Sequence, residues 1–503
     1  MTLEFTAAAF HPTVAPTISA ANTKGFMYAS ILNNKNHKKR SWLCALMLVF
    51  LGSFFLAACG GGPSPVERAA RLPGDELPQT PQISDADTPQ AVAPLQEETA
   101  DQEPVVIALM LPLSGSEGDT GQALLRAATI ALFDAYDPRL KLLPMDTEAD
   151  PAVAERRAQQ AIEAGASVVL GPLLAANVEA VGEILAPTGI PVIGFSNDST
   201  VAEPGRFIMG FLPEAEVKRV VDYALAQGLS NFGALVPQGR YGNRIRASFG
   251  DAVAESQAVI SAIESYPPDA AALFEPVKRL ARYDERRDDA RREVRFLRSL
   301  GDDVTDEIAA AVEDAEVMEG VNFDAVLVPE GGALMRTLAP LLPFYEIDPN
   351  RVKLLGTGLW NDDGLLGEPP LQGAWFAAPD PTSPKAFLAR YEKTYSNRPP
   401  RLATLAYDAM SLVARLAREP IIDKIPDGGD PGQLNTLSAS DSRFSLARFM
   451  TNEGFVGVDG LFRFLADGTV ERSLAVLEVH RSGFKVVDPA PDSFPAFGYA
   501  LKN

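Results

Sequence analysis

The sequence predicts an α/β protein built on mainly parallel β-sheets. Strand-like and helix-like segments alternate from residue 104 onward, a pattern typical of parallel strands joined by helices. The run Val105–Leu111 is apolar at every position, whereas a strand with one face in water would alternate apolar and polar residues. The unbroken run therefore indicates a strand buried on both faces, as in a parallel sheet.

The first unit, residues 105–132, shows strand, loop and helix in succession. Pro112 ends the strand because it lacks a backbone donor, and Ser114 and Gly115 begin a small, flexible loop. From Gly121 the apolar residues recur at helical spacing. The loop lies at the carboxyl end of the strand, where ligands bind in open α/β sheets. It can equally be an ordinary connection.

The same pattern repeats along the rest of the chain. Gly165 and Gly228 are placed to end two of the helices. Further strands are expected at 140–145, 167–172, 190–195, 207–211, 232–236, 259–266, 323–329 and 352–356. Further helices are expected at 152–164, 177–186, 214–227, 244–256, 334–345, 384–397 and 404–418. Residues 462–464 and 475–479, with a turn at 467–468, predict a closing hairpin.

The amino terminus has the organisation of an export signal. A basic cluster at 35–40 precedes an apolar run at 42–56, and Leu56-Ala57-Ala58-Cys59 resembles a bacterial lipobox. Residues 1–58 are thus expected to be a signal peptide, with Cys59 lipidated and anchored to a membrane. Gly60, where enterobacterial-type lipoproteins carry Asp for inner-membrane retention, implies the periplasmic face of the outer membrane of a Gram-negative bacterium. The alternative is an uncleaved amino-terminal anchor.

Residues 59–103 are rich in Pro, Gly, Asp, Glu and Gln. Such a segment cannot bury enough apolar surface to fold, so it is expected to be a disordered tether. Residues 104–503 then form the folded part.

Composition argues against several classes of function. The formal net charge of −21 argues against nucleic-acid binding, because phosphate backbones repel an acidic chain. Both cysteines, Cys44 and Cys59, precede the folded part. The chain has only three histidines and no phosphate-binding Gly-Lys-Ser/Thr motif. We therefore expect no enzyme activity, no metal and no cofactor.

The order of the loops resembles the type I periplasmic binding fold, and in particular leucine-binding-protein-like receptors. The resemblance covers about residues 105–487. It is carried by ALMLPLSGSEGDTGQALLRAATIAL, VVLGPLLAANVEAV, GIPVIGFSND, Tyr241-Gly242 and GFVGVDGLFRFLADGTVERSLAVLEV. It implies two lobes, each a mainly parallel sheet flanked by helices, joined by three crossovers. The first lobe is expected at 104–213 and 352–454, and the second at 214–351 and 455–487.

Two segments resemble a narrower group, the outer-membrane lipoproteins that activate penicillin-binding proteins. They are GPLLAANVEAV and FDAVLVPEGGALMRTLAPLLPFYEI. The short tether has no room for the helical-repeat domain of the enterobacterial members. The resemblance implies a lipoprotein that binds and activates a penicillin-binding protein in peptidoglycan synthesis. The alternative is the substrate-binding lipoprotein of a branched-chain amino-acid type ABC transporter.

The loops that would line a cleft supply the candidate ligand residues. In amino-acid receptors of this fold, the loop equivalent to 171–177 usually gives hydroxyls to the ligand carboxylate, but here it contains neither Ser nor Thr. Free leucine, isoleucine and valine are therefore not expected to bind tightly. The alternative is a cleft that only preserves the turns of the fold. The candidates are Ser114, Gly115, Gly171, Pro172, Asn177, Ser196, Asn197, Thr200, Tyr241, Glu330 and Trp360.

Residues 282–320 differ from the rest of the chain in their density of charge. Apolar residues keep three-and-four spacing on both sides of Gly301, which predicts a charged helical hairpin inserted in the second lobe. The hairpin is either a partner-binding arm or a solvated insertion.

Overall fold

The computed structural model describes residues 103–318, 320–419 and 442–495. The predicted signal peptide, Cys59 and the tether up to residue 102 lie outside the described residues. Within the described ranges, none of the helices has the length and apolar character needed to span a bilayer.

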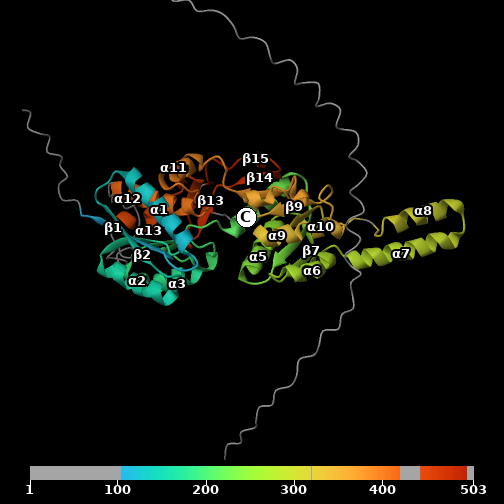
Figure 1. Cartoon of the computed structure of the whole chain (residues 1–503), viewed down its shortest axis with the longest axis horizontal. Helices are drawn as coiled ribbons and strands as arrows, with labels where there is room; N and C mark the ends of the chain where they lie inside the picture. The colour runs from blue at the N-terminus through green and yellow to red at the C-terminus, as the bar shows by residue number, and fades with distance from the viewer. Residues whose placement is uncertain (1–102, 319, 420–441, 496–503) are drawn as a thin grey trace, which may run out of the picture. The chain divides into compact units, whose positions relative to one another are not determined.

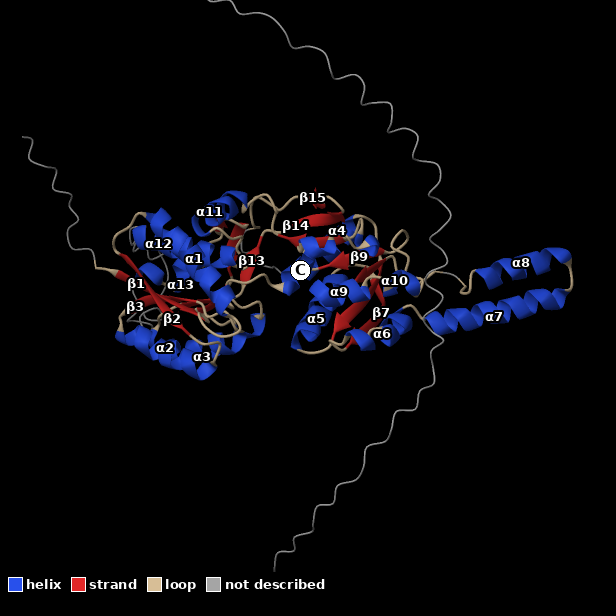
Figure 2. Ribbon diagram, in the orientation of Figure 1, coloured by secondary structure: helices blue, strands red, loops and turns tan. Residues whose placement is uncertain are grey.

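The first sheet is parallel, as the sequence predicts, with strand order β2-β1-β3-β4-β5. Helices α1 and α12 cover one face and α2 and α3 cover the other (Figures 1 and 2). Because both faces are covered, the side chains of β1 are almost all buried. The strands are β1 (Val105–Leu111), β2 (Leu140–Asp146), β3 (Ala166–Leu170), β4 (Val192–Gly194) and β5 (Arg206–Ile208). The helices are α1 (Gly118–Ala135), α2 (Pro151–Glu163), α3 (Ala175–Leu185), α11 (Lys385–Tyr395), α12 (Ala403–Arg418) and α13 (Leu446–Phe449).

The second sheet has the order β15-β14-β10-β9-β8-β6-β7, and its last two strands in sequence are antiparallel. Helices α4 and α5 pack on one face, and α6, α9 and α10 pack on the other. The strands are β6 (Asn231–Pro237), β7 (Val259–Tyr266), β8 (Ala325–Leu327), β9 (Lys353–Gly356), β10 (Trp375–Ala378), β14 (Ala475–His480) and β15 (Gly483–Asp488). The helices are α4 (Pro213–Ala226), α5 (Arg240–Ala254), α6 (Phe274–Leu280), α9 (Gly332–Leu338) and α10 (Leu341–Phe344).

Two of the predicted lobe boundaries are wrong. Strand β9 pairs with β8, and β10 pairs with β9, so residues 353–378 belong to the second lobe instead of the first. A small antiparallel sheet belongs to the first lobe, because its phenylalanines pack around Phe207 in the core of that lobe. Its strands are β11 (Phe455–Gly457), β12 (Gly460–Phe464) and β13 (Val470–Arg472).

The predicted pairing of residues 462–464 with residues 475–479 in a closing hairpin is also wrong. Strand β12 pairs with β13, while β14 leaves for the second sheet. The chain thus passes between the lobes after β5, after β10 and between β13 and β14.

The charged segment contains two packed helices, α7 (Tyr283–Leu300) and α8 (Asp303–Asp314), which lie side by side (Figure 1). Val294, Leu297 and Ala309 are buried between them. Asp302 caps α8 by accepting hydrogen bonds from the N–H groups of Val304 and Thr305. Four large apolar side chains of this hairpin remain exposed, namely Phe296, Leu300, Val304 and Ile308.

Candidate functional site

A cavity of about 500 Å³ opens where residues of the two lobes meet, and its volume lies within the range of small-molecule sites. We call it the cleft. The second lobe contributes Tyr241, Gly358, Leu359 and Asn361, and two crossovers contribute Phe211, Ala378 and Pro379. The first lobe contributes Glu117, Thr120, Leu173, Leu174, Phe195, Asn197, Arg401 and Leu402.

The loop after β3 gives the cleft an apolar wall. Gly171 has a φ of +84°, and a Cβ there would lie 2.0 Å from the carbonyl oxygen of Met110. Gly171 is therefore needed for the path of the loop, and Pro172 follows it directly. The residues that reach the cleft are Leu173 and Leu174, so the loop offers no side-chain donor to a ligand carboxylate.

Glu216 of α4 places a carboxyl group at the cleft. Its Oε2 accepts a hydrogen bond from the backbone N–H of Gly358 at 2.9 Å. Burial raises the pKa of Glu216 to about 8, although the Gly358 N–H and the Arg401 charge act in the opposite direction. At neutral pH the carboxyl group is therefore mostly protonated and can donate a hydrogen bond.

Arg401, just before α12, brings a guanidinium group to the cleft. Its Nη1 lies 2.7 Å from Oδ1 of Asp459 and donates to Oγ1 of Thr404 at 2.9 Å. Its guanidinium carbon lies over the ring of Phe211, 4.5 Å from the ring centroid. The side chain is 32% exposed, so it is fixed from behind but still reaches the cleft.

Three buried charged residues, Asp408, Asp459 and Arg472, lie behind Arg401. We call these three residues and Arg401 the hinge cluster. Asp408 accepts a hydrogen bond from the N–H of Val458 at 2.7 Å. Burial, with the nearby Asp459 carboxylate, raises the pKa of Asp408 to about 7 against the opposing charge of Arg472. Arg472 donates to the carbonyl oxygen of Gly210 at 3.1 Å and immediately precedes the third crossover. The cluster therefore ties two crossover segments to the core of the first lobe.

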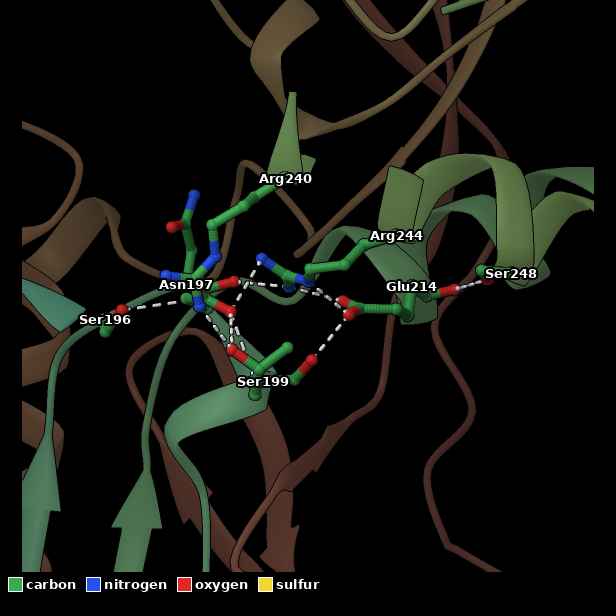
Figure 3. A network of polar contacts seen from close by, with 9 residues as sticks. Ser196, Asn197, Ser199, Glu214, Arg240, Arg244 and Ser248 are labelled. Atoms are coloured by element: carbon green, nitrogen blue, oxygen red, sulfur yellow. Dashed lines mark hydrogen bonds and ion pairs between the residues drawn. The ribbon is translucent and has the colours of Figure 1, made fainter. Parts of the chain in front are cut away.

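A second ionic group joins the lobes directly, and we call it the latch: Asp198, Glu214, Arg240 and Arg244 (Figure 3). Arg240 lies 3.0 Å from Asp198 and donates to Oγ1 of Thr200 at 2.7 Å. Arg244 donates to the carbonyl oxygen of Asn197 at 2.7 Å and to both carboxylate oxygens of Glu214. Because α5 belongs to the second lobe and residues 197–200 to the first, the bonds from Arg240 and Arg244 to residues 197–200 hold the lobes together. Glu214, in α4 of the second lobe, holds Arg244 in place.

The pKa values of the two latch carboxylates are lowered, whereas those of the buried acids Glu216 and Asp408 are raised. Burial pushes the pKa of Glu214 up, but hydrogen bonds from Arg244 and Ser199 bring it below its ordinary value. Burial likewise opposes the change at Asp198, whose pKa is lowered by Thr200 and by the charges of Arg244 and Arg240. Both latch acids are therefore ionised at neutral pH.

Comparison with known proteins agrees with this two-lobed geometry. A family model described as periplasmic binding protein matches residues 104–284. An ABC transporter substrate-binding protein from Sphaerobacter thermophilus is 18% identical, with a TM-score of 0.56 over 78% of this chain and 99% of that one. A putative branched-chain amino acid ABC transporter protein from Rhodospirillum rubrum is 18% identical, with a TM-score of 0.55 over 76% and 100% of the two chains.

The chain has the type I periplasmic binding fold.

An uncharacterized protein of Rickettsia prowazekii is 22% identical over 181 residues, which are 36% of this chain. The match covers 48% of that curated relative, so the chain matches about half of its length. Over both lobes, the similarity to the two solved structures is a similarity of fold, because the sequence identity is only 18%.

The structure brings together only some of the predicted ligand residues. Asn197 and Tyr241 line the cleft. The Tyr241 hydroxyl lies 3.5 Å from Oγ1 of Thr357, and burial raises its pKa, so it stays protonated. Ser196 accepts a hydrogen bond from the N–H of Asp198 at 3.0 Å, and Thr200 binds Arg240. These two residues support the latch loop.

The remaining predicted residues lie outside the lining of the cleft. Trp360 is fully buried in the second lobe, and its Nε1 donates to the carbonyl oxygen of Glu330 at 2.9 Å. Glu330 itself accepts from the hydroxyl of Tyr266 at 2.8 Å. Trp360 is therefore covered by packing within the lobe, whereas Glu330 is half-buried and is absent from the lining of the cleft. Ser114 and Gly115 stay in an exposed loop, and Asn177 is buried in α3.

Glu216 and Arg401 are cleft residues that the sequence prediction missed. Glu216 falls in the apolar stripe of α4 with Val217, Val220 and Val221, and an acid at such a position is a usable signal. No comparable signal marks Arg401, because its place depends on Asp459, 58 positions later in the chain. Within the residues that the structure describes, no group of three or more His, Cys, Asp or Glu is placed to hold a metal.

Proposed function

We propose that this protein is a periplasmic receptor that binds a small organic molecule in the cleft between its lobes. The observation that carries the proposal is the cleft itself, in which apolar walls from both lobes surround a few polar groups. The named relatives with this fold include ABC transporter substrate-binding proteins. They favour a substrate-binding protein of an ABC transporter, the second function that the sequence predicts, over an activator of a penicillin-binding protein, the first.

Leucine, isoleucine and valine remain poor candidates for the ligand. Leu173 and Leu174 occupy the loop that would donate to their carboxylate, so this loop cannot hold these amino acids as it does in the amino-acid receptors of this fold. The test is a thermal-shift screen of small metabolites against the full chain, followed by calorimetry of each hit. A matched variant, Leu174→Trp, should fill the cleft and abolish every hit. Hits that survive this variant would place binding elsewhere and contradict the proposal.

We propose further that Cys59 anchors the receptor by lipid to the periplasmic face of the outer membrane. The support is the lipobox Leu56-Ala57-Ala58-Cys59 after a basic and an apolar segment. Labelling with a palmitate analogue should mark the wild-type chain and not Cys59→Ala. Label on the mutant would show that the anchor is another residue.

A second candidate function is activation of a peptidoglycan synthase. Besides the sequence resemblance, it is supported by the α7–α8 hairpin, where Phe296, Leu300, Val304 and Ile308 are 57%, 53%, 66% and 47% exposed. Replacing residues 284–316 by a short Gly-Ser linker should leave the fold intact and abolish stimulation of glycan polymerisation by a penicillin-binding protein. Full stimulation by the deleted chain would return the hairpin to a solvated insertion.

A further inference from the structure

The free edge of the Arg401 guanidinium suggests the chemical class of the ligand. Its Nη1 is used by Asp459 and Thr404. No hydrogen bond from Nε or Nη2 is present among the described residues. These two atoms form the side of the guanidinium that binds a carboxylate through two parallel hydrogen bonds.

The surroundings of Arg401 hold this edge in place. The guanidinium carbon lies over the ring of Phe211, and Asp459, whose side chain is fully buried, contacts Nη1. A guanidinium that is already ordered loses little conformational entropy when it binds a carboxylate. The contacts therefore describe a preorganised anion site with one open side.

The rest of the cleft is suited to an apolar body. Leu173, Leu174, Phe195 and Leu359 line it. The remaining polar partners include the amides of Asn197 and Asn361 and the hydroxyl of Tyr241. Glu216, with its pKa raised to about 8, adds a neutral carboxyl group at pH 7.

We propose that the ligand is a small apolar or aromatic carboxylate without an ammonium group, held by Arg401 through two hydrogen bonds. The inference rests on the proposed function, because it names the ligand class of the same cleft. Arg401 thus takes the role that hydroxyls of the loop after β3 would otherwise have. Glu117 also lines the cleft, so recognition of an ammonium group is the competing arrangement that the experiment must separate.

Three probes of nearly equal size separate these arrangements. They are 3-phenylpropanoate, its primary amide and phenylalanine, each titrated calorimetrically into the full chain in detergent. We expect the carboxylate to bind at least tenfold more tightly than the amide, because only the carboxylate matches the guanidinium edge. Equal binding of acid and amide, or tighter binding of phenylalanine, would overturn the ligand class and leave the receptor function standing.

The variant Arg401→Lys tests the residue itself while keeping a positive charge beside Asp459. It should weaken binding of 3-phenylpropanoate at least tenfold and leave the amide within twofold, because lysine lacks the planar two-donor edge. The control is Arg398→Lys, an exposed residue three positions earlier, which should change neither. Unchanged binding of the acid by Arg401→Lys would overturn the inference. Absence of binding by all three probes and by the metabolite screen would overturn the receptor function as well.

Discussion

The hinge cluster and the latch are built from the same residue types, yet their surroundings differ. In the hinge cluster, Asp459 has a fully buried side chain and Arg472 is 7% exposed. In the latch, Arg240 is 72% and Glu214 30% exposed at the side chain. Both groups contact segments that run between the lobes. The two acids of the hinge cluster are cut off from water, whereas the side chains of Asp198 and Glu214 in the latch are 14% and 30% exposed.

This difference in burial sets the direction of the acid pKa values. In the latch, hydrogen bonds and arginine charges outweigh burial, so the pKa values of Asp198 and Glu214 are lowered. In the hinge cluster, burial and a like charge outweigh Arg472, so the pKa of Asp408 is raised. An ion pair near the surface therefore favours the ionised acid, whereas deep burial favours the neutral acid even when arginine is near.

The largest expected loss of stability follows from removing the ion-pair partner of a buried charge. Asp459→Ala leaves Arg401 without its ion-pair partner and Arg472 with only Asp408 nearby, which should cost about 3–5 kcal/mol of unfolding free energy. Urea denaturation followed by circular dichroism measures it. The control Asp251→Ala, on the exposed side of α5, should change stability by less than about 0.5 kcal/mol. A loss below about 1 kcal/mol at Asp459 would show that water reaches the cluster.

The next effect is a dependence of stability on pH. Native Glu216 keeps its proton up to about pH 8, while an unfolded glutamic acid loses it near 4.5. The folded chain therefore binds more protons in this interval, and its stability falls as pH rises, by up to about 1.4 kcal/mol per pH unit. Glu216→Gln should flatten the curve, measured by denaturation at pH 5, 6, 7 and 8. Asp408 acts with the same sign up to about pH 7, so part of the slope should remain.

The latch acids act with the opposite sign. Their lowered pKa values stabilise the fold above the ordinary range of a carboxyl group, and this contribution is lost as pH falls through their native values. Glu214→Gln should therefore reduce the loss of stability below pH 4.5. It should change the slope between pH 5 and 8 only slightly, because the Glu214 charge is the smallest of the causes that act on the pKa of Glu216. A slope above pH 5 reduced as much as by Glu216→Gln would contradict the separation of the two groups.

A smaller effect is expected from opening the latch. Arg244→Gln removes hydrogen bonds to Glu214 and to the carbonyl oxygen of Asn197, and the arginine is only 12% exposed. We expect a loss of about 1–2 kcal/mol, with a larger radius of gyration in solution scattering as the lobes separate. Arg240→Gln, at a mostly exposed arginine, is the matched comparison and should cost less than about 1 kcal/mol. Equal losses of unfolding free energy would show that the burial of the arginine does not determine how much each ion pair stabilises the fold.

The smallest effect is expected for an ion pair whose two side chains are both more than half exposed. Arg298 and Glu313 pair between α7 and α8 with side chains 53% and 58% exposed. Arg298→Ala should change unfolding free energy by less than about 0.5 kcal/mol. A loss as large as that of Arg244→Gln would mean that the hairpin depends on this pair for its packing.

Local pattern was enough to predict most of the elements of the fold. The apolar run Val105–Leu111 is β1, and the predicted helix at 404–418 differs from α12 by one residue. Such patterns are local because a buried strand or an amphipathic helix repeats its apolar positions within a few residues. The sequence likewise predicted that the loop at Leu173 and Leu174 has no hydroxyl groups to offer a ligand, because this loop is one short contiguous segment.

Only the tertiary structure decided which lobe holds β9, β10 and β11–β13, and which side chains reach the cleft. Trp360 and Glu330 follow strands at the edge where ligands bind, yet packing within the second lobe covers Trp360, and Tyr266 donates a hydrogen bond to Glu330. Arg401 reaches the cleft because a buried carboxylate far along the chain fixes it there. Strand pairing and the burial of charge depend on partners distant in sequence, so spacing along the chain determines the elements but not their neighbours.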